Sequence, residues 1–228
     1  MCNKNEHFCV KQKENCRFQG NIITHKTPSL LHKISILVKH FNHSIMVTIL
    51  TKENSIANQY MVELRDVEIQ KDRLRFRHNL ERLGEIIAYE ISKTLTYKPK
   101  TVETPLGTAT HNVLEDQPVL ATIIRAGLPF HQGMLRVFDQ ATNAFMAAYR
   151  HTKKSGEMEI QKKYSNSPNL DDKVVIVPDP MLATGRSLVL CCKELLAEYS
   201  IKELHIAVVI ASEEGLQHVQ AFLPEARI

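Results

Sequence analysis

Long apolar runs are missing from this 228-residue sequence. Its most apolar early stretch, residues 30–50, contains Lys33, Lys39 and three histidines, so no window reaches the ~18 uninterrupted apolar residues of a membrane helix. The first residues also lack the apolar core and cleavage site of a secretory signal, and a single arginine in residues 1–45 is few for a mitochondrial transit peptide. We therefore expect a cytoplasmic protein that does not enter a membrane.

A strong charge of one sign is missing from most of the chain. The formal net charge is +4, but residues 1–45 hold seven basic and two acidic side chains, whereas residues 46–228 hold 22 and 23. Nucleic-acid-binding domains concentrate positive charge on their folded part, so nucleic-acid binding is not expected of residues 46–228. Residues 1–45 are predicted to be a basic disordered leader, or to precede a true start at Met46. The overall composition, 43% hydrophobic, is sufficient for one domain with a sizeable core.

Cysteine pairs of the metal-binding or disulfide kind are also missing. Cys2, Cys9 and Cys16 lie seven residues apart, and Cys191 and Cys192 are adjacent in an apolar run. Metal sites use close pairs such as CxxC, and disulfide frameworks belong to secreted proteins. We expect reduced thiols, with Cys191 and Cys192 packed in or near the core.

Helical and strand patterns alternate along the rest of the chain. Helical spacing of apolar residues marks four segments: 71–95, 128–141, 187–199 and 213–223. Strand patterns mark five more: 118–124, 143–149, 159–164, 173–177 and 203–212, of which 159–164 reads as a strand or hairpin arm. The alternation predicts an α/β fold with a mainly parallel sheet covered by helices on both faces. After Pro224 the pattern begins a further strand, so we expect the domain of residues 46–228 to be truncated at its C-terminus.

The segment Val174–Ser187, VVIVPDPMLATGRS, has the strongest functional signal. Ligands of open parallel sheets bind at the carboxyl ends of strands, where loops lead into helices. Gly185 allows close approach of a ligand, Thr184 adds a hydroxyl, and Ser187 is predicted to cap the next helix. These features suit a phosphate monoester, with Asp179 accepting hydrogen bonds from ribose hydroxyls. The Walker pattern GxxxxGK[ST] is absent.

This segment resembles the phosphoribosyl-diphosphate loop of type I phosphoribosyltransferases. Its single Asp179, followed by Pro180 and Met181, is similar to the uracil phosphoribosyltransferases in particular. The strings TPLGTA, LATIIRAGLPFHQGML and FDQATNAFMAAYR resemble the same family in its order, and the resemblance extends from about Met46 to Ile228. It implies the type I phosphoribosyltransferase fold and the transfer of ribose 5-phosphate from phosphoribosyl diphosphate to uracil, which yields UMP and diphosphate in pyrimidine salvage.

The resemblance also implies the site residues. Those expected to bind phosphoribosyl diphosphate are Arg125, Ala126, Gly127, Arg150, Asp179, Pro180, Met181, Leu182, Ala183, Thr184, Gly185, Arg186 and Ser187. Arg125 and Asp179 are the expected catalytic residues, because a guanidinium fork suits a departing diphosphate and a carboxylate suits the ribose. Mg²⁺ is expected to arrive mainly on the substrate, without a metal site built by the protein. A homodimer or larger homo-oligomer is implied, and GTP is left open as an activator.

Three departures from the family pattern stand out. The family's uracil-binding segment, GDAGD, is absent, and no glycine of this sequence is followed by aspartate, so the uracil-binding residues are unassigned. Arg186 occupies a position where a small residue is frequent, and Pro178 lacks an amide donor. The alternative hypothesis is therefore a truncated, non-catalytic protein that binds phosphoribosyl diphosphate or has a regulatory role.

Two weaker candidates complete the sequence analysis. Arg73, Arg75 and Arg77 could form an anion site or a solvated or intersubunit helix face, and the second interpretation is favoured. His131 follows the Arg125 loop, but no carboxylate is placed by the sequence to make it a general base, so a structural role is expected.

Overall fold

A computed structural model describes residues 47–152 and 158–228, with side chains for residues 47–147 and 166–228. The predictions made for residues 1–45, including Cys2, Cys9 and Cys16, lie outside the described residues, as does the side chain of Arg150.

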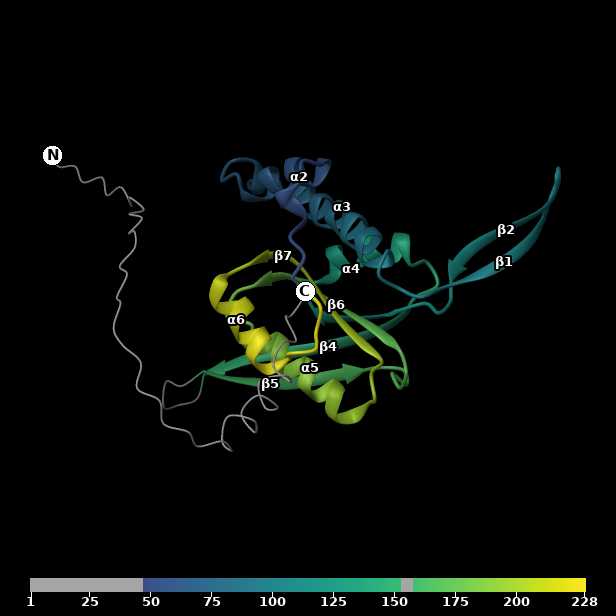
Figure 1. Ribbon diagram of the computed structural model, residues 1–228. Coiled ribbons are helices and arrows are strands. Elements are labelled where there is room, and N and C mark those ends of the chain that lie inside the picture. Colours follow the sequence, from purple (N-terminus) through teal and green to yellow (C-terminus); the bar gives the residue numbers. More distant parts are fainter. Residues whose placement is uncertain (1–46, 153–157) are drawn as a thin grey trace, which may run out of the picture. The chain divides into compact units, whose positions relative to one another are not determined.

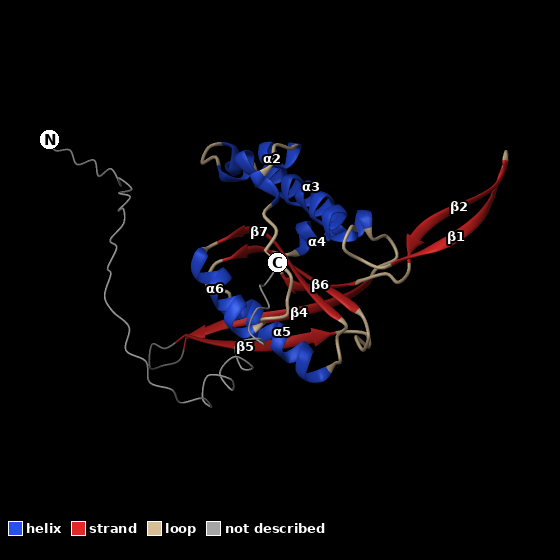
Figure 2. Ribbon diagram, viewed as in Figure 1, coloured by secondary structure: helices blue, strands red, loops and turns tan. Residues whose placement is uncertain are grey.

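Helices and strands alternate as the sequence predicts (Figures 1 and 2). The helices are α2 (Ile56–Arg65), α3 (Arg73–Ser92), α4 (Leu128–Val137), α5 (Arg186–Glu198) and α6 (Glu213–Phe222), with short 3-10 turns at Leu50–Lys52 and Ile69–Lys71. The strands are β1 (Tyr97–Thr104), β2 (Gly107–Leu114), β3 (Val119–Ile124), β4 (Thr142–Thr152), β5 (Met158–Asn166), β6 (Val174–Leu182) and β7 (Glu203–Ala211). No helix within these described ranges is long and apolar enough to cross a bilayer.

Five strands form the central sheet in the order β5-β4-β3-β6-β7. β4, β3, β6 and β7 run parallel, and β5 pairs antiparallel with β4, which confirms the mainly parallel sheet with a hairpin arm. Beyond β7, Arg227 forms a single parallel bridge with His205, where the sequence predicts the start of a further strand.

β6 is longer than the predicted strand, which ended at Val177. Its pairing with β7 continues to Leu182, whereas its pairing with β3 involves only Val175 and Ile176. Pro178 and Pro180 have no N–H to donate, so they fit a strand whose ladder on one side has already ended. The strand therefore carries Asp179 within it instead of in a loop.

Both faces of the sheet are covered by helices. On β6, Val175 and Val177 pack in one apolar cluster with residues of α5 and α6, whereas Ile176 packs in another with α3 and α4. This alternation follows from the two-residue period of a strand. Cys191 and Cys192 on α5 are fully buried in the first cluster, so the packing predicted for these thiols is confirmed.

Two elements were not predicted from the sequence. One is the antiparallel β1–β2 hairpin (Figure 1). Every residue of β1 is exposed. The other is α2, which begins after its capping residue Ser55. A hairpin exposed on both faces has no apolar alternation to detect, and α2 buries only Ala57 and Leu64.

Candidate functional site

The sheet order brings the predicted site residues to one edge. β3 lies between β4 and β6, and the carboxyl ends of adjacent parallel strands meet at the same edge. The structure places the predicted residues as follows: Arg125, Ala126 and Gly127 in the turn after β3, Arg150 in β4, Asp179, Pro180, Met181 and Leu182 in β6, Ala183, Thr184 and Gly185 in the next loop, and Arg186 and Ser187 in α5.

The turn after β3 is packed tightly against its surroundings. The Leu128 N–H donates to the Arg125 carbonyl at 3.2 Å, and the His131 N–H donates to the Gly127 carbonyl at 2.9 Å. A Cβ atom on Gly127 would lie 2.8 Å from Thr122 Cγ2 and 3.3 Å from the Pro178 carbonyl oxygen. Gly127 therefore brings this turn into contact with β6, while the Arg125 and Ala126 side chains stay exposed to a ligand.

The loop after β6 turns through a left-handed residue. Gly185 has φ 69° and is the N-cap of α5, with no side chain capping the helix. The capping role predicted for Ser187 is wrong, because the left-handed turn starts the helix at Arg186 and leaves Ser187 inside its first turn. The first amides of α5 therefore have no side-chain partner.

Capping divides the helices of the described chain into two groups. Side chains of Ser55, Asp72 and Ser212 accept hydrogen bonds from the first amides of α2, α3 and α6. No side chain caps α4 or α5, and both have glycine at the N-cap. Unpaired amides and the helix dipole favour an anion at the start of α5. At the start of α4 the Leu128 N–H is bonded to the Arg125 carbonyl and Pro129 has no N–H, so that end offers the helix dipole but few free amides.

Asp179 is a half-buried carboxylate in β6. Burial raises its pKa, and the hydrogen bond that it accepts from the Met181 N–H at 3.3 Å lowers it by a smaller amount. A carboxylate with one long hydrogen bond retains acceptor capacity. It is thus suited to accept hydrogen bonds from neighbouring hydroxyl groups of a ligand.

His131 forms part of a buried layer beneath the turn after β3. Its side chain is 4% exposed, its Nδ1 is hydrogen-bonded to the Thr122 hydroxyl, and its ring packs against Phe145 with centroids 5.4 Å apart. Burial lowers the pKa of His131, against a smaller opposite effect of its hydrogen bond to Asn143. A buried neutral imidazole without a carboxylate partner fits the structural role expected from the sequence.

Ser212 contacts the candidate site, although the sequence does not indicate it. The strand pattern predicts a strand that includes Ser212, but β7 ends at Ala211 and Ser212 caps α6. Its hydroxyl also donates to the carbonyl of Ala183 in the loop after β6. The available signal was a serine before two glutamates, Glu213 and Glu214, at a strand-to-helix junction.

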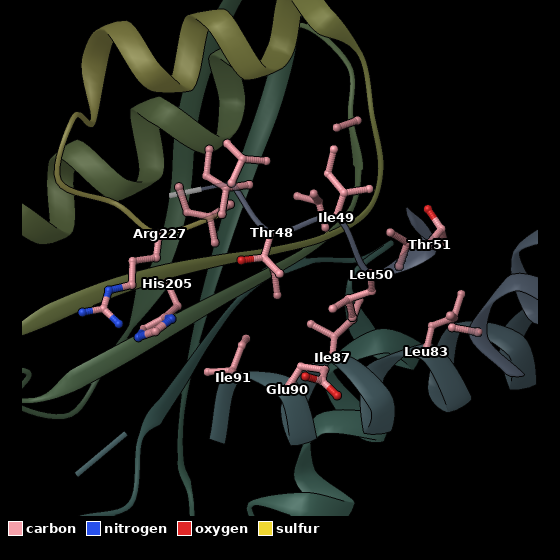
Figure 3. A pocket seen from close by; sticks show the side chains of 18 of the residues that line it. Thr48, Ile49, Leu50, Thr51, Leu83, Ile87, Glu90, Ile91, His205 and Arg227 are labelled. Carbon is pink, nitrogen blue, oxygen red and sulfur yellow. The ribbon is translucent and has the colours of Figure 1, made fainter. Parts of the chain in front are cut away.

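A separate apolar cavity of about 560 Å³ lies along β7 (Figure 3). Its walls come from residues 47–51, α2, α3, β7, α6 and residues 227–228, and neither candidate loop lines it. At one end the Glu203 carboxylate lies 2.9 Å from His205 Nε2 and 2.8 Å from Arg227 Nε. Apolar walls do not suit a diphosphate, so this cavity is distinct from the candidate site.

The arginines at the start of α3 are exposed. Arg75 lies 3.4 Å from the Glu63 carboxylate of α2. The pKa of Asp72 is lowered mainly by the hydrogen bond that its carboxylate accepts from the Arg75 N–H, and less by the positive charges of Arg75 and Arg77. The arrangement agrees with the favoured interpretation of a solvated helix face.

Known proteins resemble this chain over most of its length. The family described as uracil phosphoribosyltransferase matches residues 51–228. A curated uracil phosphoribosyltransferase of Porphyromonas gingivalis is 50% identical over 173 residues, which is 76% of this chain and 80% of the relative. One of Thermococcus gammatolerans is 35% identical over 173 residues and 75% of each chain. The solved AQ2163 protein from Aquifex aeolicus is 29% identical with a TM-score of 0.70, over 80% of this chain and 85% of that one. This chain belongs to the uracil phosphoribosyltransferase family.

Proposed function

We propose that this protein transfers ribose 5-phosphate from phosphoribosyl diphosphate to N1 of uracil, which yields UMP and diphosphate in pyrimidine salvage. The observation that carries the proposal is a pair of candidate loops after two adjacent parallel strands: the uncapped start of α5 after β6, and the turn with the exposed Arg125 after β3. Phosphoribosyl diphosphate has anionic groups at both ends of one sugar. Two neighbouring anion sites suit such a substrate.

The loop after β6 is the proposed site of the 5′-phosphate. Gly185 leaves room for the phosphate, the amides at the start of α5 donate to it, and Thr184 and Ser187 add hydroxyl donors. Arg186 is exposed and adds a positive charge at this helix end. Residues 180–183 connect Asp179 to Thr184 and are proposed to line the same site.

The turn of Arg125, Ala126 and Gly127 is the proposed site of the diphosphate, together with Arg150. The exposed Arg125 guanidinium offers parallel N–H donors that match the oxygens of a diphosphate. Arg125 then stabilises the negative charge that grows on the leaving group.

The reaction breaks the bond between C1′ and the diphosphate oxygen and forms a bond from C1′ to N1 of uracil, which loses its proton. The diphosphate keeps the electron pair of the broken bond, so positive charge develops on the sugar. Asp179 holds the ribose hydroxyls and places a carboxylate near that charge, and no covalent nucleophile is required.

The family implies a metal requirement linked to the substrate, and we propose Mg²⁺. Among residues 47–147 and 166–228, no three His, Cys, Asp or Glu side chains form a group able to hold a metal ion. Asp179 is a single carboxylate with spare acceptor capacity, which fits an ion that takes most of its ligands from diphosphate and water. Bound there, Mg²⁺ would neutralise charge on the leaving diphosphate.

The test is UMP formation by the purified 228-residue chain from labelled uracil, phosphoribosyl diphosphate and Mg²⁺. We expect UMP from the wild type and a large loss of UMP with Asp179→Asn, which keeps the size of the side chain. Binding of phosphoribosyl diphosphate without UMP would refute the transfer reaction and support the non-catalytic alternative.

We also propose that the protein is a homodimer or larger homo-oligomer. Isolated two-stranded hairpins are marginally stable in water, yet β1–β2 exposes Val102 and, at its turn, a fully exposed Leu106. A second copy that covers this hairpin would remove these apolar groups from water. Sedimentation should show a smaller species for Val102→Asp/Leu106→Asp, but not for Leu196→Asp, which changes an exposed residue of α5. An unchanged mass of the double variant would refute the role of the hairpin.

A cytoplasmic location and activation by GTP stay predictions. Addition of GTP to the UMP assay tests the second, because an activator raises the rate at a fixed substrate concentration.

A further inference from the structure

Ser212 joins the end of β7 to the loop that follows β6. Its N–H donates to the Leu182 carbonyl at 2.9 Å, and its hydroxyl donates to the Ala183 carbonyl. The hydroxyl oxygen in turn accepts a hydrogen bond from the Gly215 N–H at 2.9 Å. One serine thus holds the last carbonyl of β6 and the first carbonyl of the loop while it caps α6.

The bond to the Ala183 carbonyl determines the direction of the next amide. In a planar trans peptide the C=O of one residue and the N–H of the next point in opposite directions. Because Ser212 holds the Ala183 carbonyl toward α6, the Thr184 N–H points away from α6. Thr184 begins the stretch whose amides lead into the uncapped start of α5.

Close packing prevents the loop from relaxing toward α6. A Cβ atom on Gly215 would overlap the Ala183 carbonyl oxygen, and one on Gly185 would lie 3.1 Å from the Gly215 carbonyl oxygen. The first turn of α6 therefore packs against the loop, and the hydrogen bond from the Ser212 hydroxyl to the Ala183 carbonyl sets the loop's orientation.

We propose that Ser212 is a positioning residue for the 5′-phosphate, acting through the peptide between Ala183 and Thr184. The inference rests on the proposed function, since it assigns the 5′-phosphate to this loop. Ser212 itself does not touch the substrate. Its effect is confined to the phosphate end, because the diphosphate turn after β3 has its own hydrogen bonds.

The experiment compares three variants of the full chain by calorimetric binding. Ser212→Ala removes both the hydrogen bond to the Ala183 carbonyl and the N-cap of α6, whereas Ser212→Thr keeps a hydroxyl that can make both hydrogen bonds. Ser55→Ala is the matched control, because it removes the N-cap hydrogen bond of α2 at Ala57 without a contact to either loop. The probes are phosphoribosyl diphosphate, ribose 5-phosphate and inorganic diphosphate.

We expect Ser212→Ala to raise the Kd of ribose 5-phosphate and of phosphoribosyl diphosphate by roughly three- to tenfold, the range of one lost hydrogen bond. The Kd of inorganic diphosphate should not change. Ser212→Thr should restore wild-type affinity, and Ser55→Ala should lower the melting temperature like Ser212→Ala without altering any Kd.

Other results would overturn the positioning role of Ser212, the proposed reaction, or both. Equal Kd values for ribose 5-phosphate in the wild type and Ser212→Ala overturn the positioning role alone. A parallel loss of diphosphate affinity overturns it too, because the effect would then be a general loosening of the site. A wild type that binds ribose 5-phosphate but forms no UMP refutes the proposed reaction and does not affect the positioning role of Ser212. A wild type that binds neither sugar phosphate refutes both the reaction and the positioning role.

Discussion

Gly127→Ala adds a methyl group at the tightest point of the candidate site. The new Cβ would lie 2.8 Å from Thr122 Cγ2, 2.9 Å from the Ile123 carbonyl oxygen and 3.3 Å from the Pro178 carbonyl oxygen. Gly127 has φ −68°, a conformation open to alanine. The whole effect is therefore steric and not a consequence of backbone strain.

The contacts give the size of this effect. Two of them are more than ~0.5 Å shorter than ordinary van der Waals separations, and overpacking of this kind costs about 1–3 kcal/mol. For a chain of this size that lowers the melting temperature by roughly 2–12 °C. The strain relaxes most easily by movement of the exposed turn, which carries Arg125 and Ala126 away from the position proposed for the leaving diphosphate. We expect kcat/KM to fall by about tenfold to a hundredfold.

Steady-state UMP kinetics and thermal unfolding measure the two effects. Thr122→Ser removes the Cγ2 methyl group and keeps the hydroxyl that bonds His131, so the double variant with Gly127→Ala should recover part of the lost activity and stability. Recovery should be incomplete because the Ile123 carbonyl remains. Wild-type kinetics and a wild-type melting temperature for Gly127→Ala would refute the steric clash at this turn. Strict additivity in the double-mutant cycle would refute the contact with Thr122.

Three further predictions follow from buried groups. Asp179→Asn should raise the melting temperature at pH 7, because burial raises the pKa of Asp179 and penalises its ionised form. The gain should vanish at low pH as the carboxyl protonates, and a constant difference across pH would contradict this. Burial lowers the pKa of His131, so the stability that the neutral imidazole allows is lost below about pH 6.5, where the unfolded chain binds the proton more readily than the folded chain. His131→Gln should therefore make the melting temperature fall less steeply as the pH drops below this value, and an unchanged slope would count against a buried neutral imidazole. In a chain with Cys2, Cys9 and Cys16 replaced by serine, a thiol reagent should label Cys191 and Cys192 only after unfolding, and labelling of the native chain would argue against their burial.

Elements with a buried face were predictable because burial leaves a period in the sequence. The long helix was expected within residues 71–95 and occupies Arg73–Ser92, where it buries Leu80, Leu83 and Ala88. The strands of the parallel sheet were marked by short runs of apolar residues, and the position of the Arg125 turn after one of them was predicted in the same way. The β1–β2 hairpin and α2 were missed because they bury few or no side chains.

The candidate site was predicted only where its residues are contiguous. The string from Asp179 to Ser187 is a local pattern, so the sequence alone pointed to a phosphate loop and to the family. The N-cap of the helix was misjudged by two residues, because Gly185, with a left-handed φ of 69°, and not Ser187 precedes the first helical residue.

By itself the sequence determined the α/β class, the positions of most strands and helices, and the family to which the chain belongs. Only the tertiary structure decided which loops meet, because strand order depends on pairing between segments distant in the chain. It also decided that α6 holds the loop after β6, since the Ser212 hydroxyl and the Ala183 carbonyl lie 29 residues apart and become partners only when β7 pairs with β6. A hydrogen bond between residues so far apart leaves no periodic signal, because its geometry is created by the fold.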